Sequence, residues 1–408
     1  MTLRWNTRRV GSLLAVIAAV GTIGSLAAAA SGANSSATAA PYRILIITGI
    51  KTLVQNQEEA IAGATAAAKA INAAGGLKGR PVEIDSCNNQ GTATGTIDCA
   101  RQAAQGNYDD VMEYHGFTSA SKPILDQAQM PRIGTTNVVG PDFFDRYDVD
   151  LGPPPNAYYS APGIYLIKNQ HKTRFAIVSL DIAAGLSIAQ GIRAGLTAAG
   201  GKYVGTIPIP LTQTDLLPTV QQLKDLKPDI VAVVANGPVV TSLMNARQEL
   251  GLNALVVGSA TAIPSTAYAS MPDGGAGLYV GQALPPSTDA RFAPFRSQLA
   301  AAGLAGNPVN LDSVSAKAWL STWAIKKLCD TIKTGSCTKQ TLLAQTRKAK
   351  NINLFNILNW SPSAKGPAAY PYQTVGTAYV LKAVNGALLL ASNKPVDYYA
   401  TLGIKPKK

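Results

Sequence analysis

Residues 71–90 read INAAGGLKGRPVEIDSCNNQ, and this stretch joins a helix-like segment to a strand-like one across a glycine-rich turn. Apolar residues recur upstream at steps of three and four, at Ile61, Ala64, Ala68 and Ile71. This period predicts an amphipathic helix, and Gly75-Gly76 ends it because glycine readily adopts the left-handed conformation of a helix C-terminus. PVEID at 81–85 then predicts a strand, so the stretch predicts a helix, a turn and a strand.

The same alternation continues on both sides of this unit. RILIIT at 43–48 is a nearly continuous apolar run, typical of a strand buried on both faces of a sheet. The next predicted segments are a helix over 95–105, a strand over 110–115, a helix over 121–129 and a strand that begins at 132. Strand, helix and strand repeated in this order predict right-handed crossovers and a parallel sheet.

The pattern restarts after the proline-rich stretch at 151–163. Its segments are strands over 174–180, 203–209, 230–235 and 254–258, with helices over 185–199, within 214–229 and over 238–250. We expect Thr214 to cap the second of these helices. Two successive series predict two doubly wound α/β lobes rather than one large sheet.

Late segments indicate that the chain crosses between the lobes more than once. A helix is expected over 310–333, where the spacing of Trp319, Leu320 and Trp323 places these side chains in a core. Strand-like runs at 353–360 and 377–386 finish the chain.

The first forty residues differ from the rest. A basic start holds Arg4, Arg8 and Arg9, an apolar run follows, and small residues end the segment. This order predicts a secretory signal peptide over 1–40. A transmembrane anchor is the alternative, but glycines and serines in the apolar run favour removal. The export route, general or twin-arginine, stays open.

Four cysteines lie in two local pairs, Cys87 with Cys99 and Cys329 with Cys337. Outside the cytosol, an even number of closely spaced cysteines indicates disulfides, and of the three possible pairings we favour the two sequential ones. Neither pair has the spacing of a zinc knuckle or a nearby histidine, so no metal site is predicted. No cysteine precedes Cys87, which predicts export without a lipid anchor.

Charge and motifs narrow the function further. Removing the three arginines of the signal lowers the formal net charge from +13 to +10, and the basic residues are scattered. Scattered charge and export argue against a nucleic-acid partner. The two histidines, His115 and His171, lie in no motif that pairs them with a nucleophile, and no P-loop or H-E-x-x-H motif occurs. We therefore expect neither enzymatic activity nor a cofactor.

Polar loops follow the predicted strands, at the edge where open α/β sheets bind ligands. They lie at 48–52, 115–121 and 134–138 in the first lobe, and at 181–185, 235–238 and 258–262 in the second. The first-lobe loops are rich in hydroxyls and precede helix N-termini, which suits a carboxylate or another acceptor head group. Serine and threonine also cap helices without binding a ligand. We expect Thr118, Ser119 and Thr136 to contact the ligand.

Several stretches together resemble the leucine/isoleucine/valine-binding proteins, the periplasmic solute receptors of ATP-driven importers. The matching stretches are AAAKAINAAGGLKGRPVEI at 66–84, HGFTSAS at 115–121, RFAIVSLDIAAG at 174–185, and the segments 214–237 and 365–371. The resemblance covers nearly all of the chain after the signal. It implies the type I periplasmic binding protein fold, in which two Rossmann-like lobes close on a ligand by hinge motion.

On that template the chain crosses three times between the lobes. Lobe one comprises 41–162 and 284–358, and lobe two comprises 163–283 and 359–408. The hydroxyls and backbone groups of the first-lobe loops would hold the ligand's carboxylate. The implied partner is an ABC permease in the membrane, and the protein itself is expected to be a monomer.

The chain departs from this family where a branched-chain amino acid would be recognised. The resemblance implies an aromatic side chain at Ala184, an acidic one at Ala260 and a threonine at Val138. An ammonium group buried without a carboxylate is strongly unfavourable, so a simple branched-chain amino acid is not the expected ligand. Asp181 could substitute as its counter-ion.

We therefore expect an exported solute-binding protein of an ABC importer. On the second lobe, the ligand contacts are expected from Asp181, Ala184, Asn236 and Ala260. An apolar or aromatic carboxylate or amide is expected in preference to leucine. A ligand-sensing module that signals to a partner protein is the alternative, and the sequence does not separate the two.

Overall fold

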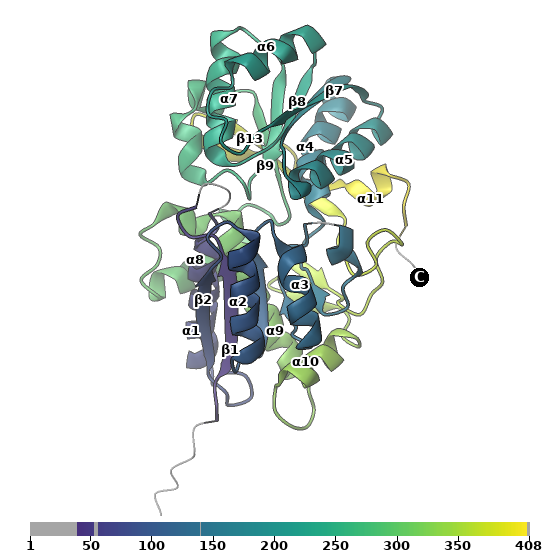
Figure 1. Cartoon of the computed structure of the whole chain (residues 1–408). Coiled ribbons are helices and arrows are strands. Elements are labelled where there is room, and N and C mark those ends of the chain that lie inside the picture. Colours follow the sequence, from purple (N-terminus) through teal and green to yellow (C-terminus); the bar gives the residue numbers. More distant parts are fainter. Residues whose placement is uncertain (1–38, 53–55, 139, 406–408) are drawn as a thin grey trace, which may run out of the picture. The chain divides into compact units, whose positions relative to one another are not determined.

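The computed structural model describes residues 39–52, 56–138 and 140–405. The signal peptide predicted for 1–40 lies, apart from its last two residues, outside the described residues. Two sheets organise the described chain (Figure 1). The strand order is β2-β1-β3 in the first sheet and β14-β13-β10-β9-β8-β6-β7 in the second, with β15 beside β13. The predicted α/β class with two doubly wound lobes is confirmed.

The first sheet is parallel and has helices on both faces. Its strands are β1 (Tyr42–Thr48), β2 (Val82–Asn88) and β3 (Asp110–Tyr114). The helices around it are α1 (Glu59–Ala73), α2 (Ala93–Gln105), α3 (Thr118–Gln127) and α9 (Ser313–Asp330). Helices α1 and α9 share an apolar core with one face, and α2 and α3 share another with the opposite face. Trp319 and Leu320 are fully buried in the first of these cores, as predicted, and Trp323 packs against it.

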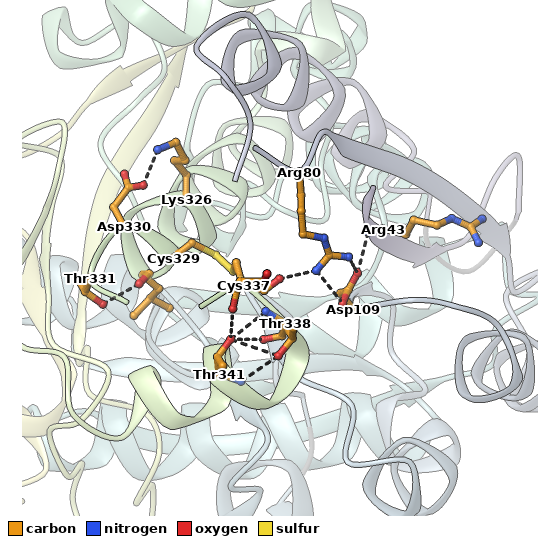
Figure 2. The surroundings of a disulfide bond; sticks show 12 residues. Arg43, Arg80, Asp109, Lys326, Cys329, Asp330, Thr331, Cys337, Thr338 and Thr341 are labelled. Carbon is orange, nitrogen blue, oxygen red and sulfur yellow. Dashed lines mark hydrogen bonds and ion pairs between the residues drawn. A yellow bond between two sulfur atoms is a disulfide. The ribbon is translucent and has the colours of Figure 1, made fainter. Parts of the chain in front are cut away.

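The glycine turn after α1 has the geometry that the sequence predicts. Gly76 has a φ of +72°, and its N–H donates to the Ile71 carbonyl at 2.9 Å. A Cβ at Gly76 would lie 2.2 Å from the Arg80 carbonyl oxygen, so this position requires glycine. The Arg80 guanidinium donates to the Pro41 carbonyl at 2.7 Å. It also donates to Asp109 at 2.8 Å (Figure 2). These contacts hold the turn against the first sheet.

The second sheet is parallel from β7 to β10 and antiparallel beyond. Its strands are β6 (Arg174–Leu180), β7 (Lys202–Ile209), β8 (Ile230–Val234), β9 (Leu255–Ser259), β10 (Leu278–Gln282), β13 (Thr377–Val384), β14 (Ala387–Leu390) and β15 (Val396–Asp397). One face packs on α6 (Leu217–Leu226) and α7 (Gly237–Glu249). The other packs on α4 (Pro155–Gln170), α5 (Ala183–Ala198) and α11 (Tyr398–Thr401) (Figure 1).

The chain passes between the two sheets three times. It leaves the first sheet after β5 (Asp148–Val149) and returns after β10 through α8 (Ala293–Ala301) and α9. It leaves again after a hairpin of β11 (Ile352–Leu354) and β12 (Leu358–Trp360), which replaces the single strand expected over 353–360. The lobe limits given above remain a prediction, and the first of them falls inside α4.

Two predicted elements differ from the structure, one in its pairing and one in its start. The strand expected at 132 is only β4 (Arg132–Ile133), which pairs with β5 in a small sheet of its own. Thr214 does not cap α6, because the helix begins at Leu217 and the Asp215 carboxylate accepts from its N–H at 2.9 Å. Pro218 has a fixed φ and no N–H, so it fits the first turn and the helix starts just before it.

Both predicted disulfides are present. Cys87–Cys99 joins β2 to α2, and Cys329–Cys337 joins the end of α9 to the loop before α10 (Lys339–Thr346) (Figure 2). The Cα atoms are 5.7 Å apart in the first bridge and 5.5 Å apart in the second. Each bridge closes a short loop, which stabilises the fold by about 2–3 kcal/mol in the chain-entropy model.

Candidate ligand-binding site

A cavity lies at the carboxyl ends of strands from both sheets. Tyr114, Leu180 and Val234 line it, and they are the last residues of β3, β6 and β8. The cavity holds about 1150 Å³ of empty space, counting the solvent at its mouth. This position is that of a site for a small organic molecule in an open α/β fold.

Most side chains around the cavity are aromatic or aliphatic. The larger ones are Tyr114, Phe117, Val138, Tyr158, Tyr159, Leu180, Ile182, Ile188, Val234, Leu284 and Val314. The polar ones are Asn56, Gln57, Thr136, Asn236, Thr261, Ser313 and Lys317. Among the described residues that line the cavity, Lys317 is the only charged one. Such a lining suits an apolar ligand body that carries few polar groups.

Polar side chains of the lining lie near the starts of helices and the ends of strands. Asn236 caps α7, and its side chain accepts from the Val239 N–H at 3.2 Å. Gln57 precedes α1 and is 4% exposed, and its amide donates to the Thr261 carbonyl at 2.9 Å. Thr261 follows β9, so this hydrogen bond joins a loop of the first sheet to a loop of the second.

Lys317 reaches the cavity from α9. Its ammonium lies 2.6 Å from Asp150 Oδ1, and it donates to Thr136 Oγ1 at 2.9 Å and to the Thr135 carbonyl at 3.3 Å. The Asp150 side chain is fully buried and does not line the cavity. The pairing is needed because an isolated buried ammonium is strongly unfavourable. The pair therefore presents its positive member to the cavity and keeps its negative member behind it.

The structure brings three of the predicted ligand residues to this cavity, namely Thr136, Ala184 and Asn236. Val138, where the resemblance implies a threonine, lines it as well. The ligand roles of these residues stay predictions.

Thr118, Ser119, Asp181 and Ala260 do not line the cavity. The Thr118 hydroxyl is buried and donates to the Asp142 carboxylate. Ser119 and Asp181 have exposed side chains. Ala260 lines a separate hollow beside β9, and the next residue, Thr261, takes the place at the main cavity. The ligand roles of these four residues also stay predictions.

Sequence reasoning missed Lys317 and Gln57. Lys317 lies in the run SVSAKAWL, where small and apolar residues surround a single lysine on the buried face of a predicted helix. Lysine is almost never buried unless it is paired, so this position carried a signal of a special environment. Gln57 lies ahead of its helix among polar residues, where nothing marked it.

In the described part of the chain, no histidine, cysteine, aspartate or glutamate lines the cavity. Neither histidine lines it: His115 is buried with its Nε2 3.2 Å from Glu113 Oε1, and His171 ends α4. In the part of the chain that the structure describes, no group of three or more His, Cys, Asp or Glu residues could hold a metal ion. None of the helices formed by the described residues has the length and apolar character needed to span a membrane.

Comparisons with known proteins agree with this architecture. A family model described as periplasmic binding protein matches residues 41–377. A search of curated protein sequences found no match.

Several solved structures share the fold of this chain at low sequence identity. A possible leucine/isoleucine/valine-binding protein from Rhodopirellula baltica has a TM-score of 0.74 at 12% identity, covering 90% of this chain and 98% of its own. A fatty acid ABC transporter substrate-binding protein from Thermomonospora curvata has a TM-score of 0.73 at 16% identity, with 88% and 92% covered. A leucine-binding protein from Thermotoga maritima has a TM-score of 0.70 at 14% identity, with 86% and 98% covered.

Proposed function

The chain belongs to the periplasmic binding proteins, and on this premise we propose that it is an exported solute-binding protein that delivers a small organic ligand to an ABC permease in the membrane. The cavity at the carboxyl ends of strands from both sheets supports this role. Two disulfides are consistent with an oxidising compartment outside the cytosol. We propose no enzymatic activity, because neither histidine lines the cavity and Lys317, which does, is held in an ion pair.

The proposed ligand is an apolar or aromatic carboxylate or amide rather than a branched-chain amino acid. One observation carries this choice: no described residue that lines the cavity is acidic. The ammonium group of an amino acid would lose its water there without gaining a counter-ion. Asp181, the possible substitute, has an exposed side chain outside the lining. The similar structures include both a leucine-binding protein and a fatty acid transporter's binding protein, so the choice rests on the cavity side chains.

A thermal-shift panel tests this function. The chain without its signal, with both disulfides intact, is heated with amino acids, aromatic acids, fatty acids and their amides. A ligand at a hundred times its Kd stabilises the folded state by about 2.7 kcal/mol, which raises the Tm visibly. We expect apolar carboxylates or amides to raise the Tm and leucine to leave it unchanged.

Two results would count against the proposal. Stabilisation by leucine that disappears in Asp181→Ala would contradict the choice of ligand. A panel in which no compound raises the Tm would contradict the binding role itself.

A further inference from the structure

We propose that the buried Lys317–Asp150 pair selects a carboxylate, in preference to an amide or an amine, as the head group of the ligand. The inference rests on the proposed solute-binding function and assigns one part of the cavity to the head group. Lys317 orients the Thr136 hydroxyl and attracts an anion by its charge. It is therefore a residue that determines ligand specificity.

The ion pair is oriented toward the cavity. The Lys317 side chain is 8% exposed and lines the cavity, whereas the Asp150 side chain is 0% exposed and lies behind it. An anion in the cavity is therefore nearer to the ammonium than to the carboxylate. Because Coulomb energy falls with distance, the neutral pair still attracts an anion and repels a cation.

The hydrogen bonds of the ammonium determine how Thr136 can meet a ligand. A lysine ammonium has three N–H donors, and here three acceptors surround it: Asp150 Oδ1, Thr136 Oγ1 and the Thr135 carbonyl. Thr136 Oγ1 accepts from the charged ammonium, so the hydroxyl hydrogen of Thr136 points away from Lys317. Thr136 lines the cavity, where this hydrogen is a donor for a ligand oxygen. Accepting a hydrogen bond from a cation makes a hydroxyl a stronger donor.

A second hydroxyl lies on the same face of α9. Ser313 is four residues before Lys317 and also lines the cavity. Its buried Oγ has no hydrogen-bond partner among the described residues. A buried hydroxyl without a partner is unfavourable, which is relieved when a ligand oxygen accepts from it.

These features predict different affinities for a carboxylate, an amide and a protonated amine. A carboxylate accepts from the hydroxyls and is attracted by the ion pair. An amide carbonyl accepts as well, but it gains little from the charge, and its NH₂ group finds no anion in the described lining. A protonated amine accepts no hydrogen bond and is repelled.

Isothermal titration with matched probes tests the inference. The probes are hydrocinnamate with hydrocinnamide and decanoate with decanamide, which differ only in the head group. In the wild-type chain we expect the carboxylate to bind about tenfold more tightly than its amide, the range of one hydrogen bond to a charged group.

The double variant K317M/D150N removes both charges and leaves neither one buried alone. We expect its carboxylate-to-amide affinity ratio to fall by about tenfold, because only the carboxylate loses the attraction of the ion pair. Lys327→Met is the matched control, because Lys327 is exposed on the same helix and outside the cavity lining, and its ratio should equal that of the wild type. If the double variant fails to fold, Thr136→Val is used instead. It removes the hydroxyl between Lys317 and the ligand and should weaken carboxylate binding about tenfold.

The possible outcomes keep the two proposals distinct. Tighter binding of the amides, or an unchanged ratio in the folded double variant, overturns the role of the ion pair and leaves the binding function standing. An unchanged carboxylate affinity in Thr136→Val does the same. If no probe binds, the head-group inference fails, and the wider thermal-shift panel decides separately whether the binding function fails with it.

Discussion

The two walls of the cavity differ in chemistry. The wall that belongs to the first sheet and α9 carries the cation Lys317 and the hydroxyl of Thr136. The wall that belongs to the second sheet is largely aliphatic, with Leu180, Ala184 and Ile188. Its polar side chains are engaged in local hydrogen bonds. If the proposed function holds, one lobe orients the head group of the ligand and the other accommodates its apolar body.

The chain path explains how this asymmetry arises. The second wall consists of strand ends and the first turns of the helices that follow, as in any doubly wound sheet. The first wall includes in addition the face of α9, which the chain supplies only after its second crossing. A helix that joins late brings a charged side chain to the cavity without altering the strands.

The largest expected effect comes from placing a charge in the aliphatic wall. Ala184 is 8% exposed and lines the cavity, so Ala184→Asp buries a carboxylate beside the ligand. Like charges brought together without water repel strongly, and we expect apolar carboxylates to bind about a hundredfold more weakly. Titration with the tightest carboxylate of the thermal-shift panel measures the change. Ala184→Asn is the uncharged control, and equal losses in both variants would show that bulk rather than charge is responsible.

Removing the Cys87–Cys99 disulfide tests whether the stability of the first lobe can change without a change in its wall of the cavity. Cys87 and Cys99 lie in or beside the apolar core formed with α2 and α3, and neither lines the cavity. C87A/C99A should lower the free energy of unfolding by about 2–3 kcal/mol, because the unfolded chain regains loop entropy. Urea unfolding measures this loss. The Kd of the ligand should stay unchanged, and a large change in it would mean that this scaffold also shapes the site.

Loss of the hydrogen bond between the lobes should weaken every ligand equally. Gln57 donates to the Thr261 carbonyl across the cleft, and Gln57→Ala removes this contact. We expect affinities to fall by about two- to tenfold, the range of one neutral hydrogen bond, for carboxylates and amides alike. Gln340→Ala, on the exposed surface of α10, is the control. A loss confined to carboxylates would instead place Gln57 in head-group selection.

The smallest expected effect on ligand binding comes from Glu59, which should change only the pH dependence of stability. Burial raises the pKa of Glu59 from about 4.5 to about 8. Because the folded-state pKa lies above the unfolded one, this group favours folding most below about pH 4.5, and that contribution is lost as the pH rises toward 8. In Glu59→Gln the free energy of unfolding should vary less over this pH range than in the wild type. Urea unfolding at several pH values measures the difference. Glu59 does not line the cavity, so head-group preference should not change. Glu58→Gln, at the exposed neighbouring residue, is the control. An equal loss of pH dependence in this variant would contradict the role of Glu59.

The scaffold could be predicted from the sequence because its signals are local. The apolar run at 43–48 and the glycine pair Gly75-Gly76 act on the backbone within a few residues, and both have the structure they predict. The strand at 132 could be predicted, but its pairing with β5 could not, because packing and not its own residues decides the partner.

The site could be predicted only in part because it depends on contacts between distant residues. Thr118 lies in a hydroxyl-rich stretch that resembles a binding loop, yet it begins α3 and its hydroxyl donates to Asp142, 24 residues later. Lys317 and Thr136 are 181 residues apart, and only the fold brings the ammonium to the hydroxyl. Sequence patterns locate the edge of the sheet where a ligand binds, and packing determines which side chains are available there.

Under the proposed function the cavity binds an apolar acid, and its described lining residues offer no counter-ion to an ammonium group. Isothermal titration of leucine against isocaproate, and of phenylalanine against hydrocinnamate, tests it most directly, because each pair shares its body and carboxylate and differs only in the ammonium. The structure predicts that the acid without the ammonium binds more tightly in each pair. Tighter binding of leucine or phenylalanine would contradict it.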